Sequence, residues 1–118
     1  MMVVECLSRT ENLGDVNYLY NYRLVKGQMT TNIKCEKILV QTYGIEIERQ
    51  DFVSGTMENI ERDCVENISP QRHKVHNLLR MLHENGVSPL HLIDVLGEYI
   101  DTYINDYDLY ASDVATNN

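Results

Sequence analysis

Two serine-proline pairs in the second half of the chain constrain its fold more than any other feature. Ser69 and Ser88 are each followed by a proline and then by apolar residues spaced three and four positions apart. A serine hydroxyl can accept from the free N–H groups of a first helical turn, and proline suits the first helical position. Gly86 lies where the first helix needs a left-handed residue to end. The sequence therefore predicts helices over residues 70–85 and 89–107.

The predicted second helix carries a wide apolar surface. On a wheel of 100° per residue its apolar side chains cover about half of the circumference, with acidic residues opposite them. One sheet face usually covers less than this, so part of the arc is expected to meet the first helix or a second chain. Gly97, at the edge of the arc, predicts either a close backbone approach there or a tolerated surface glycine. The predicted contact residues are Val95, Tyr99, Tyr103 and Tyr107, with core packing as the alternative.

A basic ridge follows one flank of the predicted first helix, formed by His73, His76, Arg80 and His83. His73 and His76 stand three residues apart, a spacing that can place two imidazoles on one metal ion. A metal site needs three or four ligands, and no Cys-x-x-Cys or His-Glu-x-x-His pattern accompanies them. The sequence therefore favours a solvated ridge, and it predicts no metal or cofactor.

The first half of the chain instead alternates between apolar and polar residues. A short strand is predicted over residues 3–9, and a longer strand, rich in tyrosine, is predicted over 16–25. Such alternation of β-forming residues is typical of half-buried strands. Residues 26–36 are predicted to form a long loop, and a third apolar run begins at Ile38. Gly44, isolated within this run, is expected to host a β-bulge.

A hairpin centred on Ser54-Gly55 is predicted to pair residues 43–53 with residues 56–66. In this register one face is apolar, and the other carries acids so close together that it must be solvated. The predicted buried face carries Tyr43, Ile45, Ile47, Ile60 and Cys64, with Ile45 opposite Cys64, Ile47 opposite Arg62 and Arg49 opposite Ile60. The predicted solvated face carries Glu46, Glu48, Glu61 and Asp63.

One buried and one solvated face are typical of an antiparallel sheet covered by helices on one side. The order of the elements therefore predicts an α+β fold, in which an antiparallel sheet of about four strands is covered on one face by the C-terminal pair of helices. A chain of 118 residues fits one domain. We assign this domain to residues 1–107, with its strands within 2–66, and expect 108–118 to be a flexible acidic tail.

Charge is distributed unevenly along the chain, whose net charge is −8. All ten Lys and Arg residues lie at or before Arg80, whereas seven acidic residues follow it. Such a surface repels phosphate groups, so no nucleic-acid partner is predicted. No uncharged apolar run is long enough to cross a bilayer, and the N-terminus does not resemble a signal peptide, so no membrane association is predicted.

The cysteines favour a reducing cytoplasm, because they are three in number and widely spaced: Cys6, Cys35 and Cys64. Cys64 is expected to face the core, where a free cysteine acts as a small hydrophobe. Cys35 has Lys34 and Lys37 nearby, which favours its thiolate form. No orienting triad, nucleophile elbow or phosphate-binding glycine loop accompanies any of them. No catalytic residue is therefore predicted.

Three stretches carry a resemblance to a known family: Tyr43-Gly44-Ile45-Glu46-Ile47-Glu48, Asn67-Ile68-Ser69 and Val87-Ser88-Pro89-Leu90-His91-Leu92-Ile93-Asp94. From Tyr43 onward the chain resembles a small uncharacterised family of spore-forming Gram-positive bacteria. The resemblance covers about half of the chain and implies a bacterial cytoplasmic protein with a self-contained domain. It implies no catalytic or binding residues.

The sequence is most consistent with a non-enzymatic protein-interaction or regulatory module that uses its acidic second helix as the contact surface. Its partner would be an unknown protein or a second copy of the chain, as in a homodimer. A helix-turn-helix-like nucleic-acid binder is the first alternative, because a short turn joins the two predicted helices. The acids on the exposed face of the second helix disfavour it. A small enzyme with an unrecognised site is the second alternative.

Overall fold

The computed structural model describes residues 1–117, and of residues 33, 104, 105 and 107–117 it describes the backbone alone. Four strands precede the helices: β1 (Met2–Leu13), β2 (Val16–Ile33), β3 (Glu36–Val53) and β4 (Thr56–Ser69). They are followed by α1 (Arg72–Glu84), the short 3-10 helix η1 (Pro89–His91) and α2 (Leu92–Asn117).

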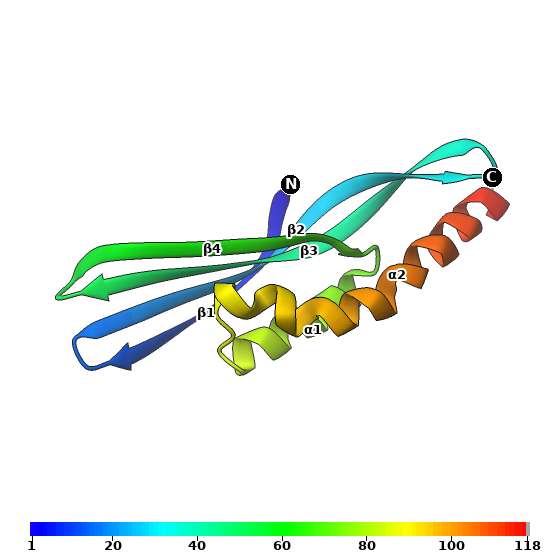
Figure 1. Cartoon of the computed structure of the whole chain (residues 1–118). Coiled ribbons are helices and arrows are strands. Elements are labelled where there is room, and N and C mark those ends of the chain that lie inside the picture. The colour runs from blue at the N-terminus through cyan, green and yellow to red at the C-terminus, as the bar shows by residue number, and fades with distance from the viewer. Residues whose placement is uncertain (118) are drawn as a thin grey trace.

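The strands form one antiparallel sheet in the order β1-β2-β3-β4, and both helices lie on the same face of it (Figure 1). The predicted α+β fold is confirmed. The molecule is elongated, with extents of 58 × 22 × 18 Å. The opposite face of the sheet carries no helix, and we call it the open face.

The core lies between the sheet and the two helices. Alternate residues of β2 and β3 point into it, including Tyr22, Leu24, Ile45 and Ile47, which are fully buried. The helices contribute Val75, Leu78, Leu79, Leu82, Leu92 and Leu96. The predicted alternation of β2 and the predicted inward orientation of Ile45 and Ile47 are therefore confirmed. The hydroxyl of Tyr22 donates to the carbonyl of Val87 at 2.9 Å, which satisfies its only polar group.

The predicted loop over residues 26–36 is wrong. β2 and β3 pair without interruption from Val16 opposite Val53 to Ile33 opposite Glu36. The turn between them is made by Lys34 and Cys35, whose φ values of 50° and 66° match the left-handed pair of a tight hairpin turn. β1 and β4 do not reach this end of the sheet, so residues 27–42 form a two-stranded arm (Figure 1).

The predicted register of the β3–β4 hairpin is correct only beside its turn. Phe52 lies opposite Met57 as expected, but Asp51 lies opposite Asn59, because Glu58 is an extra residue in β4. This bulge shifts the rest of the pairing by one residue, so that Ile45 lies opposite Val65, Ile47 opposite Asp63 and Arg49 opposite Glu61. A shift of one residue exchanges the faces of a strand. Ile60 and Cys64 therefore lie on the open face, whereas Glu61 and Asp63 lie on the helix face.

The expected bulge at Gly44 is confirmed, and the irregularity is in the partner strand. Tyr43 lies opposite Ser69 and Ile45 opposite Val65, which leaves residues 66–68 unpaired across from Gly44. A Cβ atom at Gly44 would lie closer than 3.0 Å to backbone atoms of Val65 and Glu66. Only glycine permits this close approach.

The helices begin later than predicted. α1 starts at Arg72, and Ser69 accepts from the N–H of Gln71 in the preceding turn instead of capping the helix. Gly86 ends α1 as predicted, with φ of 59° and the paired hydrogen bonds of a Schellman motif. The second Ser-Pro pair opens η1, so α2 begins at Leu92. The helix then continues to Asn117, through the segment expected to be a tail.

Candidate interaction surface

Helix α2 is fixed to the rest of the molecule by a buried carboxylate. Asp106 of α2 is only 7% exposed. Its two oxygens accept from Lys74 Nζ at 2.9 Å, and Oδ2 also accepts from Ser69 Oγ at 3.1 Å. Lys74 belongs to α1 and Ser69 to the end of β4, so one side chain joins three elements. α2 therefore presents its outer face from a fixed position.

The structure divides the four predicted contact residues. Val95 and Tyr103 are partly buried against the core, and the Tyr103 ring lies 5.1 Å from Lys74 Nζ. Tyr99 is 38% exposed and lies 6.5 Å from Tyr103 between ring centroids. Tyr107 lies outside the residues whose side chains are described. Of the three residues whose side chains are described, Tyr99 is therefore the most open to a partner.

A second exposed apolar surface lies at the start of α2, and the predicted surface does not contain it. Leu90 is 70% exposed and Ile93 is 59% exposed, more than Tyr99. At 100° per residue, Ile93 lies about 140° around the helix from Asp106, and so on the flank away from α1. Ile93 belongs to the wide apolar arc of the sequence. The arc therefore divides into a flank that faces α1 and a flank that faces solvent.

The expected close approach at Gly97 is wrong, because a Cβ atom there would meet no heavy atom within 4 Å. Gly97 belongs to the same solvent-facing flank as Ile93. This helical glycine leaves open space beside the exposed apolar residues and packs against no other element.

Two members of the basic ridge of α1, His76 and His83, contact β1, whereas His73 and Arg80 are exposed. Glu5 accepts from Arg72 at 3.0 Å and pairs with His76 Nδ1 at 2.6 Å. Burial alone would raise the pKa of Glu5, but its contacts with His76 and Arg72 lower it. His83 Nε2 lies 2.9 Å from the carbonyl of Ser8, and its ring stands edge-on to Tyr22. The ridge is therefore partly a structural contact, which the sequence alone did not reveal.

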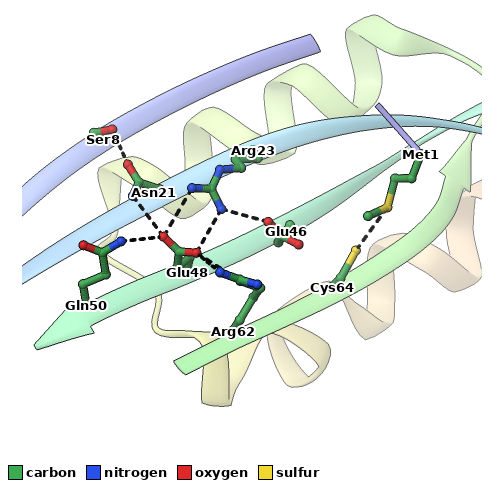
Figure 2. Close-up of polar contacts among 9 residues, drawn as sticks. All are labelled: Met1, Ser8, Asn21, Arg23, Glu46, Glu48, Gln50, Arg62 and Cys64. Atoms are coloured by element: carbon green, nitrogen blue, oxygen red, sulfur yellow. Dashed lines mark hydrogen bonds and ion pairs between the residues drawn. The ribbon is translucent and has the colours of Figure 1, made fainter. Parts of the chain in front are cut away.

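A charged cluster centred on Glu48 occupies the open face (Figure 2). Although this carboxylate was expected to be solvated, it is only 3% exposed. Arg62 Nε donates to Oε2 at 3.0 Å, Gln50 donates to Oε1 at 2.9 Å, and Arg23 reaches both oxygens at 3.3 and 3.4 Å. Burial alone would raise the pKa of Glu48, but the two arginines and Gln50 hold it at about 2. The charged side chains of this face therefore cover one another.

The three cysteines are all free. Cys64 was expected in the core but lies on the open face, half-buried, with its sulfur 4.0 Å from that of Met1 (Figure 2). Burial and the neighbouring acids, Glu46 first, raise the pKa of its thiol to about 11. Cys35 is exposed in the turn of the arm. Within the part of the chain that is described, no three His, Cys, Asp or Glu side chains are placed to share a metal ion.

The chain belongs to a family of unknown function, DUF6514, whose model matches residues 1–102. The match includes all four strands, α1 and the first part of α2, so the family likeness extends beyond the stretches after Tyr43. Comparison with curated proteins and with solved structures gave no match. None of the helices within residues 1–117 combines the length and the apolar character that spanning a bilayer requires.

Proposed function

We propose that this chain is a non-enzymatic protein-interaction or regulatory module of the bacterial cytoplasm, with α2 as its contact surface. The observation that carries the proposal is that apolar side chains are exposed at two places around a firmly anchored helix. Tyr99 is 38% exposed and Ile93 59%, while Asp106 ties the helix to both α1 and β4. Exposed apolar patches rimmed by polar residues mark interaction sites in soluble proteins.

The charge of α2 favours a protein partner over a nucleic acid. Asp94, Glu98 and Asp101 are exposed along the helix, and no Lys or Arg occurs after Arg80. The basic residues of α1 do not offset these acids, because Arg72 and His76 are turned towards Glu5. A helix inserted into a groove of DNA must neutralise phosphates. A helix-turn-helix function therefore has little support from the geometry.

Site-specific photo-crosslinking in the source cells tests the proposal. A photoreactive phenylalanine analogue would replace Tyr99, and a matched control would place it at Leu13, which is 66% exposed and is the last residue of β1. We expect the substitution at Tyr99 to give one defined adduct, with another protein or with a second copy, and the substitution at Leu13 to give none. Light scattering of the purified chain distinguishes a homodimer from a monomer. The same adducts from both positions, or none from Tyr99, would contradict the proposal.

A further inference from the structure

A groove separates the edge strand β4 from η1. Its volume is about 420 Å³, and it is lined by Ile60, Glu61, Arg62, Asp63, Pro89 and Leu90. Two of these side chains are large, apolar and exposed: Leu90 is 70% exposed and Ile60 44%. These two exposed apolar side chains thus border the hollow.

The floor of this groove is an edge strand with regular geometry. β4 is the last strand of the sheet, so within residues 1–117 no strand pairs with its outer side. Its two irregularities lie at Glu58 and at residues 66–68, and residues 59–65 between them pair continuously with β3. An edge strand of this kind offers outward N–H and C=O groups to another extended segment, although Asp63 Oδ1 already accepts from the N–H of Cys64 at 2.9 Å. Strand addition to an exposed edge is a common mode of peptide recognition.

Charge indicates what kind of segment fits this edge. β4 carries Glu58, Glu61, Asp63 and Glu66, against one basic residue, Arg62. The Arg62 guanidinium is bound to Glu48, so it offsets few of these acids. A second copy of β4 laid along the first would place the same acids against one another, which disfavours a symmetric pairing of these edges. A segment that carries Lys or Arg side chains would instead be attracted to these acids.

Glu61 supplies a separate indication. Its Oε2 atom is shielded from solvent and forms an ion pair with Arg49 Nη2 at 3.5 Å, which is long for a hydrogen bond. The side chain as a whole is 32% exposed and lines the groove. An incoming ammonium or guanidinium group can therefore reach the exposed part of this carboxylate.

We propose that the β4 groove binds an extended protein segment in which Lys or Arg alternates with Val, Ile or Leu. This inference rests on the proposed function. The segment adds to the sheet as a fifth strand beside residues 59–65. Its basic side chains point to the helix face, with their aliphatic stems against Leu90 and their charges near Glu61 and Asp63. Its apolar side chains point to the open face beside Ile60.

A defined peptide tests this inference on the intact chain. The probe is a fluorescein-labelled peptide of four Lys-Val repeats, and the controls are its Glu-Val counterpart and a copy with N-methylated backbone amides. Fluorescence anisotropy in physiological salt measures binding. We expect the Lys-Val peptide to bind at least about tenfold more tightly than either control, because the controls lack the charge or the strand hydrogen bonds.

Three variants test whether the peptide binds in the β4 groove. Leu90→Ser and Asp63→Asn are expected to weaken binding of the Lys-Val peptide at least about fivefold. Leu39→Ser is the matched control, because Leu39 is 62% exposed but lies on the arm. This variant should bind the Lys-Val peptide as tightly as the original chain does. Hydrogen exchange should show slower exchange at amides within residues 59–65 when the peptide is bound. These substitutions are at the surface, so circular dichroism should show unchanged folding.

Several results would overturn the inference. They are no binding at millimolar peptide, equal binding of the Lys-Val and Glu-Val peptides, or equal losses for Leu90→Ser and Leu39→Ser. A chain that dimerises in light scattering, and that Leu90→Ser makes monomeric, would show that a second copy fills the groove instead. If the peptide fails while crosslinking at Tyr99 succeeds, the proposed function stands and the partner class is wrong. Failure of both removes the proposed function as well.

Discussion

Glu48 provides a quantitative test of how the open face of the sheet is stabilised. The substitution Glu48→Gln keeps the size and shape of the side chain but removes the charge that Arg23 and Arg62 contact. In the folded chain the pKa of Glu48 is about 2, against an ordinary value of 4.5. At about 1.4 kcal/mol for each pH unit, this difference corresponds to about 3 kcal/mol of folding free energy at neutral pH.

The pH dependence of this contribution has a definite sign. Because the pKa is lower in the folded chain than in the unfolded chain, the contribution is complete above pH 4.5 and is lost as the pH falls towards 2. Urea unfolding at pH 7 should therefore show Glu48→Gln less stable than the original chain by about 3 kcal/mol. The difference should shrink steadily below pH 4.5, because protonated Glu48 is uncharged like glutamine.

Glu58→Gln is the matched control for this experiment. Glu58 is an exposed acid on β4, and its replacement should change the free energy of unfolding by less than about 0.5 kcal/mol. A cost below about 1 kcal/mol for Glu48→Gln at pH 7 would refute the reasoning. So would a cost that stays the same from pH 7 to pH 2.5, because it would then come from packing and not from charge.

Four further predictions concern single residues. Gly97→Ala should raise the free energy of unfolding by up to about 1 kcal/mol, because the added Cβ atom meets no heavy atom within 4 Å. Gly44→Ala should lower it by about 1–3 kcal/mol, because the added Cβ atom meets the backbone of Val65 and Glu66. Thermal melts measure both changes. Asp106→Asn should destabilise the chain by about 1–3 kcal/mol and speed hydrogen exchange in the second half of α2, because the pairing with Lys74 is lost. Cys64 should react with a thiol reagent at pH 8 more slowly than the two exposed cysteines, because its pKa is raised to about 11; mass spectrometry of partly labelled protein measures this order.

Much of the fold could be predicted because several local signals agree. Tyrosines alternate through β2, and Gly86 ends the first helix, so the sheet, the helix pair and their order follow from the sequence. The register of β4 did not follow, because Glu58 looks like any polar strand residue and one extra residue exchanges both faces. The arm was missed because Thr30 and Thr31 beside polar neighbours resemble a loop, although threonine is a good strand former.

The interaction surface was predicted only in part, for a reason that lies in the geometry of α2. A helical wheel shows how wide an apolar arc is, but it does not show where the neighbouring elements lie. In the fold, Lys74 of α1 contacts Asp106 and Tyr103, so the α1-facing flank of the arc is packed against the domain. Ile93 lies on the other flank, where the chain supplies no cover.

The position of this uncovered flank connects the helix with the sheet edge. Ile93 is exposed on the side of α2 away from α1, and the exposed Leu90 of η1 lines the groove beside Ile60 of β4. Had β4 kept the register expected from its turn, Ile60 would point into the core and Glu61 to the open face. The one-residue bulge at Glu58 reverses both, so that Ile60 is exposed and Glu61 faces the helices. The same bulge therefore breaks the simple alternation of β4 and places acidic side chains beside the exposed Ile60, and the proposed binding of a basic segment depends on this edge.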